Sequence, residues 1–153
     1  MKNISREEKR TTRYICLQLL YSEELSNQNK IGDLLKNFFN GENALFDNIS
    51  KEQVDYIKKL YKTTIDNKER VDAIIVKKLN NWDITRLAAI DKAILRMSIS
   101  EMLFIDEIPP KVSITEGVEI AKVFSTDDSS RFVNGILDSV YNDSLKDLIK
   151  FEK

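Results

Sequence analysis

The sequence contains no histidine and only one cysteine, Cys16. Histidine is the commonest general base and metal ligand, and structural zinc sites are built from cysteine and histidine side chains. A lone cysteine cannot form an intramolecular disulfide, which favours a reducing compartment such as the cytoplasm. These absences argue against an enzyme, a metal site and a bound cofactor.

Glycine and proline are also scarce, with 4 glycines and 2 prolines among 153 residues, which favours long helices over a many-stranded sheet. The glycines are scattered singly, so the sequence holds no glycine-rich phosphate loop. No run approaches the ~20 apolar residues that a membrane span needs, and the first residues lack the apolar stretch of a signal peptide. The sequence therefore predicts one cytoplasmic domain over residues 1–153, without a membrane partner.

Apolar residues recur at helical spacing along most of the chain, and no segment alternates as a strand does. Capping boxes are expected at Ser5–Glu8, Ser50–Gln53 and Ser113–Glu116. The predicted helices cover about 6–25, 34–39, 51–79 (unless Asp66-Asn67 breaks it), 88–104, a segment from Ser113, and one from Asp128 or Ser129 to about 144, with a turn or short helix at 82–87. The predicted fold class is all-α.

Basic residues form a stripe at the start of the first predicted helix: Lys2, Arg6, Lys9, Arg10 and Arg13. The first 13 residues hold five basic and two acidic side chains, in a chain of net charge −1. Cations in the first turns oppose the helix dipole, and the neighbouring Tyr14 offers a flat surface to an unpaired base. The stripe favours a local RNA-binding patch, and the alternative is an ordinary solvated helix face.

Other noticeable residues are interpreted as structural. Glu116 and Asp128 suit helix starts better than a pair of catalytic carboxylates. Cys16 is expected to be a small packing residue. Gly135 and Ala121 are expected where helices approach closely, because glycine inside a helix costs about 1 kcal/mol relative to alanine.

Several phrases, in this order and spacing, resemble the NusB family of bacterial transcription antitermination factors. They are Arg13 with Leu17-Gln18-Leu19-Leu20-Tyr21, Trp82-x-x-x-Arg86-Leu87, Asp91-Lys92-Ala93-Ile94-Leu95-Arg96 with Glu101, the segment 108–124, and Phe132-Val133-Asn134-Gly135-Ile136-Leu137. The resemblance implies two packed three-helix bundles, over about 5–80 and 82–144. It also implies binding of boxA-type ribosomal RNA leaders together with NusE, a small-subunit ribosomal protein, within the RNA polymerase antitermination complex.

The same resemblance implies which residues carry these contacts. The family's arginine-rich motif falls on Lys9, Arg10 and Arg13, with Lys2 and Arg6 close by, although Glu7 and Glu8 interrupt it. Arg131 is expected to contact phosphate and Phe132 to stack on a base, unless Phe132 belongs to the core. Tyr21, Arg86 and Asp91 are expected to meet the protein partner. A helical adaptor that binds only protein is the alternative function, and the sequence leaves both a monomer and a homodimer open.

Overall fold

The structure is a computed structural model that describes residues 4–26, 48–80, 83–146 and 149, and these residues form helices and no strand. The elements are α1 (Arg6–Ser26), α3 (Lys51–Asp66), α4 (Lys68–Lys78), the short 3-10 helix η2 (Ile84–Arg86), α5 (Ala89–Phe104), α6 (Pro110–Phe124) and α7 (Asp127–Leu145). The prediction of an all-α protein is confirmed. The helix expected at 34–39 lies outside the described residues. None of the described helices is long and apolar enough to cross a membrane.

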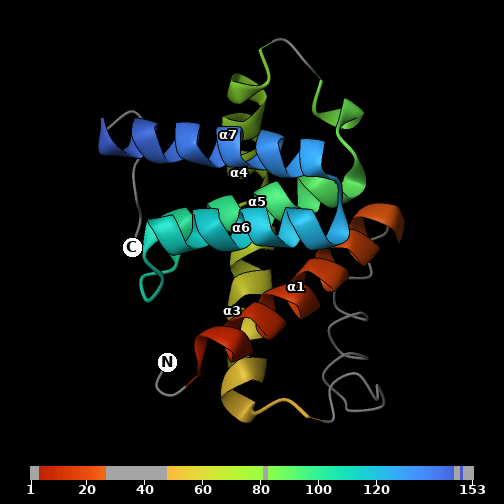
Figure 1. Cartoon of the computed structure of the whole chain (residues 1–153), viewed down its shortest axis with the longest axis vertical. Helices are drawn as coiled ribbons and strands as arrows, with labels where there is room; N and C mark the ends of the chain where they lie inside the picture. Colours follow the sequence, from red (N-terminus) through yellow and green to blue (C-terminus); the bar gives the residue numbers. More distant parts are fainter. Residues whose placement is uncertain (1–3, 27–47, 81–82, 147–148, 150–153) are drawn as a thin grey trace.

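Helix α5 lies at the centre of the molecule, and the other helices pack around it (Figure 1). Helices α6 and α7 contact each other and α5, and so form a three-helix group. Helices α1 and α3 pack together and also contact α5, whereas α4 contacts α5 and α7. The boundary expected near residues 80–82 falls at a gap in the described residues, and a division into separate bundles there stays a prediction.

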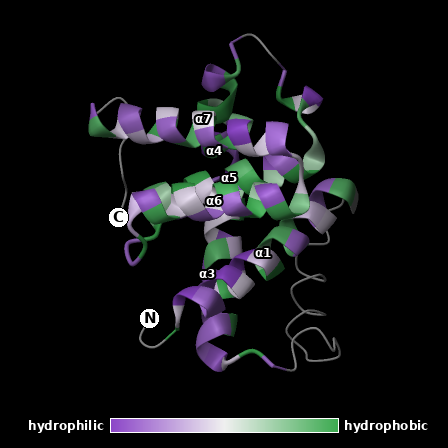
Figure 2. Ribbon diagram, viewed as in Figure 1, coloured by the Kyte–Doolittle hydropathy of each residue, from purple (hydrophilic) through white to green (hydrophobic). Residues whose placement is uncertain are grey.

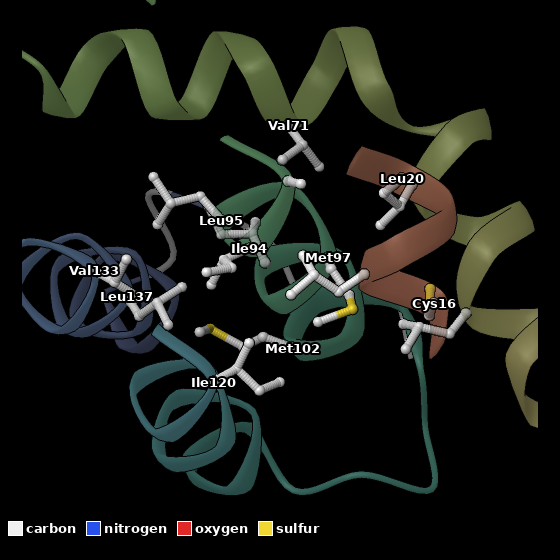
Figure 3. Packing of buried hydrophobic residues seen from close by; sticks show 14 of the residues in the cluster. Cys16, Leu20, Val71, Ile94, Leu95, Met97, Met102, Ile120, Val133 and Leu137 are labelled. Carbon is white, nitrogen blue, oxygen red and sulfur yellow. The ribbon is translucent and has the colours of Figure 1, made fainter. Parts of the chain in front are cut away.

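The core forms around α5, in which eleven of sixteen residues are buried. Its side chains meet apolar residues of four other helices, as Figure 3 shows for Leu20 of α1, Val71 of α4, Ile120 of α6 and Leu137 of α7. Figure 2 shows the same arrangement by hydropathy: α5 is mainly hydrophobic, and the first turns of α1 and α3 are hydrophilic. The helix predicted at 88–104 is therefore confirmed, and the structure places it at the centre of the fold.

The long helix predicted over 51–79 is interrupted at Asn67, as the alternative in the sequence allowed. The Asn67 side-chain amide donates to the Thr63 carbonyl at 2.8 Å, and the Asn67 backbone N–H donates to the same oxygen at 3.2 Å. Asparagine competes with helical hydrogen bonding in this way. The break allows α3 to pack on α1 while α4 packs on α7.

Two predicted helix starts were wrong, because residues earlier in the chain begin and cap these helices. Helix α6 begins at Pro110, because proline suits a first turn whose N–H groups have no partner in the helix, and the Ser113–Glu116 capping box does not form. Helix α7 begins at Asp127, where Thr126 accepts a hydrogen bond from the Ser129 N–H at 3.0 Å. The boxes at Ser5 and Ser50 are confirmed.

The prediction that Gly135 marks a close helix approach was wrong. A Cβ at Gly135 would have no atom within 4 Å, whereas a Cβ at Gly117 would lie 2.6 Å from Ser98 Oγ and 2.9 Å from Leu137 Cδ1. The close approach of α6 to α5 and α7 therefore occurs at Gly117. Ala121 and Cys16 are fully buried, as predicted for packing residues.

An ion-pair cluster ties the end of α1 to α4 and α5. Glu24 accepts hydrogen bonds from Lys92 at 2.6 Å and from Arg96 at 2.8 Å, and Arg96 also binds Asp72 through Nε at 2.7 Å and Nη2 at 2.9 Å. Burial alone would raise the pKa of Glu24, but the bonds from Lys92 and Arg96 lower it to about 2. The ionised carboxylate therefore stabilises the folded chain.

We expect this cluster to make stability depend on acid pH. The unfolded Glu24 carboxyl titrates near 4.5 and the folded one near 2, so its contribution is complete above about pH 4.5 and is lost as the pH falls towards 2. Glu24→Gln should lower the free energy of unfolding by about 1–2 kcal/mol at neutral pH, allowing for its partial exposure. Urea melts from pH 7 to pH 2 should show this difference shrinking. A constant difference would contradict the assigned pairing.

Candidate nucleic-acid interface

The basic stripe begins in the first turns of α1, where the capping box holds the helix start. The Ser5 N–H donates to Glu8 Oε2 at 2.6 Å, and the Glu8 N–H donates to Ser5 Oγ at 3.1 Å. The two acidic residues that interrupt the stripe, Glu7 and Glu8, sit in the first turn and offset the dipole there. Lys2 lies outside the described residues.

Arg10 and Arg6 both reach Glu116 of α6. Arg10 donates to its carboxylate through Nε at 2.9 Å and Nη2 at 3.1 Å, and Arg6 Nε lies 3.5 Å from the same group. The Glu116 side chain is fully buried. Burial would raise the pKa of Glu116, but the Arg10 hydrogen bond and the nearby Arg13 charge lower it overall. Glu116 thus joins α6 to α1, and the prediction that it caps a helix was wrong.

Arg13 is buried, with 2% of its surface exposed, and belongs to a polar network in the core. Its Nε lies 2.8 Å from Glu101 Oε2, and the same carboxylate accepts hydrogen bonds from Tyr56 and, at 2.9 Å, from Ser113 Oγ. Burial and the Glu101 charge raise the pKa of the Tyr56 hydroxyl, which keeps it a donor. The network joins α1, α3, α5 and α6.

This burial contradicts the prediction that Arg13 contacts RNA phosphates. A guanidinium paired inside the core cannot also neutralise a phosphate at the surface. Along the stripe, Arg6 is 76% exposed, Arg10 is 35% exposed and Arg13 is 3% exposed in its side chain. The exposure of the arginine side chains therefore falls along the stripe: Arg6 faces solvent, and Arg13 pairs with another helix inside the core.

The exposed end of the stripe borders an open pocket of about 440 Å³ between α1 and the start of α6. Arg6, Lys9 and Arg13 line it from α1, and Lys111 lines it from α6. Lys111 is exposed in the first turn of α6. The sequence analysis missed Lys111, although a cation at a helix start is the same signal that singled out α1.

Tyr14, expected to stack on a base, is half-buried and packs edge-on against Phe124 at the end of α6. The ring centroids are 5.1 Å apart and the planes are inclined by 81°. Phe124 is 38% exposed and its neighbour Val123 is 61% exposed. The aromatic pair thus remains partly open to solvent along the seam between α1 and α6.

Arg131 and Phe132 lie near the start of α7, which begins beyond the end of α6. The pocket lies at the other end of α6, and Figure 1 shows the course of the two helices. The 15 residues of α6 rise about 22 Å, so these residues do not join the basic pocket directly. Arg131 is 73% exposed and pairs with Asp128 one turn earlier. Phe132 is half-buried against the core and lines a separate pocket with Lys78 and Leu87, which supports the core reading of this ring.

The three residues expected to meet a protein partner have different surroundings. Arg86 is exposed on η2, and Tyr21 is half-buried on α1. Asp91 is only 8% exposed, and its carboxylate accepts hydrogen bonds from Ser125 and Ser129, each at 2.9 Å. Asp91 therefore anchors the α6–α7 connection to α5, and the prediction that it faces a partner is corrected.

Within the described residues, no three cysteine, aspartate or glutamate side chains gather in a way that could hold a metal ion. The arrangement at α1 and α6 instead presents fixed cations beside an apolar pocket. Such a surface can bind an anionic chain. The nearby carboxylates of Glu116 and Glu101 already form ion pairs with Arg10 and Arg13.

Comparisons with known proteins agree on the identity of this fold. The NusB family model matches residues 10–142. The chain is 42% identical over 135 residues to the transcription antitermination protein NusB of Chloroherpeton thalassium, covering 88% of this chain and 62% of that longer relative. It is 37% identical over 132 residues to NusB of Listeria monocytogenes, covering 86% and 94% of the two chains.

A solved structure is similar over nearly the same length. A chain in the crystal structure of the antitermination factors NusB and NusE in complex with double-stranded RNA matches with a TM-score of 0.76 and 27% identity, covering 90% of this chain and 98% of that one. The family match, the identities and the shared fold lead to one conclusion: the chain belongs to the NusB family.

Proposed function

We propose that this protein is a transcription antitermination factor that binds boxA-type leader RNA together with NusE. The observation that carries the proposal is membership of the NusB family, combined with similarity to a structure that contains NusB, NusE and RNA. In this role the pair holds the nascent leader and favours processive transcription by RNA polymerase. The protein contributes binding surfaces and no chemical step.

The exposed basic edge of α1 supports the RNA-binding half of the proposal. Arg6 and Lys9 border the pocket, and Arg10 retains partial exposure beside them. Because Glu116 neutralises much of Arg10, the affinity for RNA without the partner is expected to be modest. We further propose that Arg131 extends the contact along α6, and that Tyr21 and Arg86 belong to the NusE surface.

We expect the double variant Arg6→Gln/Lys9→Gln to weaken RNA binding through lost phosphate contacts. The slope of log affinity against log salt should flatten by about 1.4, since each phosphate contact on a single strand contributes about 0.7. The measurement is an electrophoretic shift of boxA-type RNA over a salt series, with and without NusE. NusE should strengthen binding of both proteins.

Lys62→Gln/Lys77→Gln is the matched control, because both lysines are exposed on α3 and α4. The control should leave affinity and slope unchanged. If the Arg6/Lys9 variant retains both values while NusE still binds, the chain is a protein-binding adaptor and the direct RNA contact is refuted.

A further inference from the structure

The pocket beside the start of α1 combines an apolar floor with a cationic rim. Its apolar lining, here named the floor, comes from the turn into α6, and three cations of its lining are named the rim: Ile108, Pro109 and Val112, then Arg6, Lys9 and Lys111. Its volume of about 440 Å³ falls in the range of pockets that hold small organic ligands. A phosphate alone gains little from an apolar floor, whereas a nucleobase presents a flat apolar face.

Arg13 adds a polar feature to the wall of this pocket. It lines the pocket although its side chain is only 3% exposed, and its Nε is already bound to Glu101. Its Nη2 has no hydrogen-bond partner among the described residues. An unsatisfied buried donor is costly. The wall of the pocket therefore includes a buried guanidinium with an unpaired donor, and Arg13 would have to shift before that donor could meet a ligand.

The charges around the pocket favour an anionic chain over a neutral ligand. Its lining includes three cations outside the core, Arg6, Lys9 and Lys111, and one acid, Glu116, which already binds Arg10 and Arg6. The fourth cation of the lining, Arg13, is paired with Glu101. Lys111 stands in the first turn of α6, where a cation opposes the helix dipole and gains from a nearby anion. A base on the floor would place its flanking phosphates at this rim.

We propose that the pocket receives one unpaired base of the bound RNA, with the flanking phosphates on Arg6, Lys9 and Lys111. The proposal rests on the proposed function, because it assigns a subsite to RNA that is already held at α1. It adds Lys111 and the turn at 108–112 to the interface. It also gives the surface a preference for an unpaired nucleotide, since a base stacked within a duplex cannot enter a pocket.

The test removes single bases from the RNA while keeping every phosphate. The complex with NusE is titrated with boxA-type RNAs that each carry one abasic nucleotide at a successive position. For the wild type, one position should lose about tenfold in affinity, the scale of a single stacked base. Val112→Trp fills the floor, so it should weaken binding of intact RNA about tenfold and abolish the penalty at that position.

Val76→Trp is the matched control, because Val76 is 46% exposed on α4 and Val112 is 37% exposed on α6. It should preserve the wild-type affinity and the abasic penalty. Lys111→Gln is a second test that does not alter the floor. The slope of log affinity against log salt should flatten by about 0.7. Thermal melts establish that each variant is folded.

The outcomes separate this proposal from the proposed function. The base pocket is overturned if Val112→Trp keeps the wild-type loss of affinity at every abasic position, or if no single abasic position weakens binding. In either case, weaker RNA binding by the Arg6→Gln/Lys9→Gln variant would still support the RNA-binding function. An unchanged slope for Lys111→Gln overturns its place at the rim. If the wild type with NusE binds no RNA, both proposals fall.

Discussion

Arg13→Ala should lower the free energy of unfolding by about 3–5 kcal/mol, the usual cost of removing one partner from a buried ion pair. Among the described residues, the variant leaves the Glu101 carboxylate, 2% exposed, with the hydroxyls of Tyr56 and Ser113 as its remaining partners. The energy lost is mainly that of an uncompensated buried charge. Urea unfolding followed by circular dichroism measures it directly.

Two further variants isolate the cause. Arg6→Ala removes an arginine from the same stripe, but its side chain is 76% exposed and its nearest approach to Glu116 is 3.5 Å, so it should cost less than about 1 kcal/mol. Arg13→Met/Glu101→Met removes both charges and should recover part of the loss, because apolar replacements of buried pairs are often well tolerated. The recovery is incomplete because the hydroxyls of Tyr56 and Ser113 lose their acceptor. Equal midpoints for Arg13→Ala and Arg6→Ala would show that Arg13 is not buried in solution.

Gly117→Leu should destabilise the protein by about 3 kcal/mol through overpacking. Its first added atom would lie 2.6 Å from Ser98 Oγ and 2.9 Å from Leu137 Cδ1, where α6 crosses α5 and α7. The helices must separate to accept the side chain, and the surrounding core would lose contacts. The midpoint of urea unfolding should fall, and the refolded protein should keep its helical spectrum.

Gly135→Leu is the matched change in the neighbouring helix. Because a Cβ at Gly135 meets no atom within 4 Å, leucine there should be neutral or should stabilise by about 0.5–1 kcal/mol through its higher helix propensity. Leucine should therefore be costly at Gly117 and tolerated at Gly135. A loss at Gly135 equal to that at Gly117 would contradict the assignment of the close helix contact to Gly117.

Local patterns explain why the helical part of the fold could be predicted. The periodic apolar positions of α5 and the serine caps of α1 and α3 involve residues within a few positions of one another, so the sequence displays them directly. The start of α6 was misjudged for the same local reason. A serine and a glutamate three residues apart match a capping box whether or not they lie at a helix end.

The roles of the charged residues required the tertiary structure. Arg13 and Glu101 are 88 positions apart, and Arg10 and Glu116 are 106 positions apart, so spacing on one helix cannot reveal that they pair. Viewed alone, α1 carries a basic stripe that only Glu7 and Glu8 interrupt. Once α5 and α6 pack against α1, Arg13 is buried against Glu101 and Arg10 pairs with Glu116. Arg6 stays exposed and Lys9 is half-buried.

The sequence by itself determined the helical class, the main helix caps and the apolar faces, because these depend on neighbours along the chain. It also pointed to the basic start of α1 as a binding surface. Only the tertiary structure decided which cations remain available, that the tight glycine is Gly117, and that Lys111 joins Arg6 and Lys9 at one pocket. Burial and pairing are properties of surfaces brought together by folding, and distant residues acquire them only there.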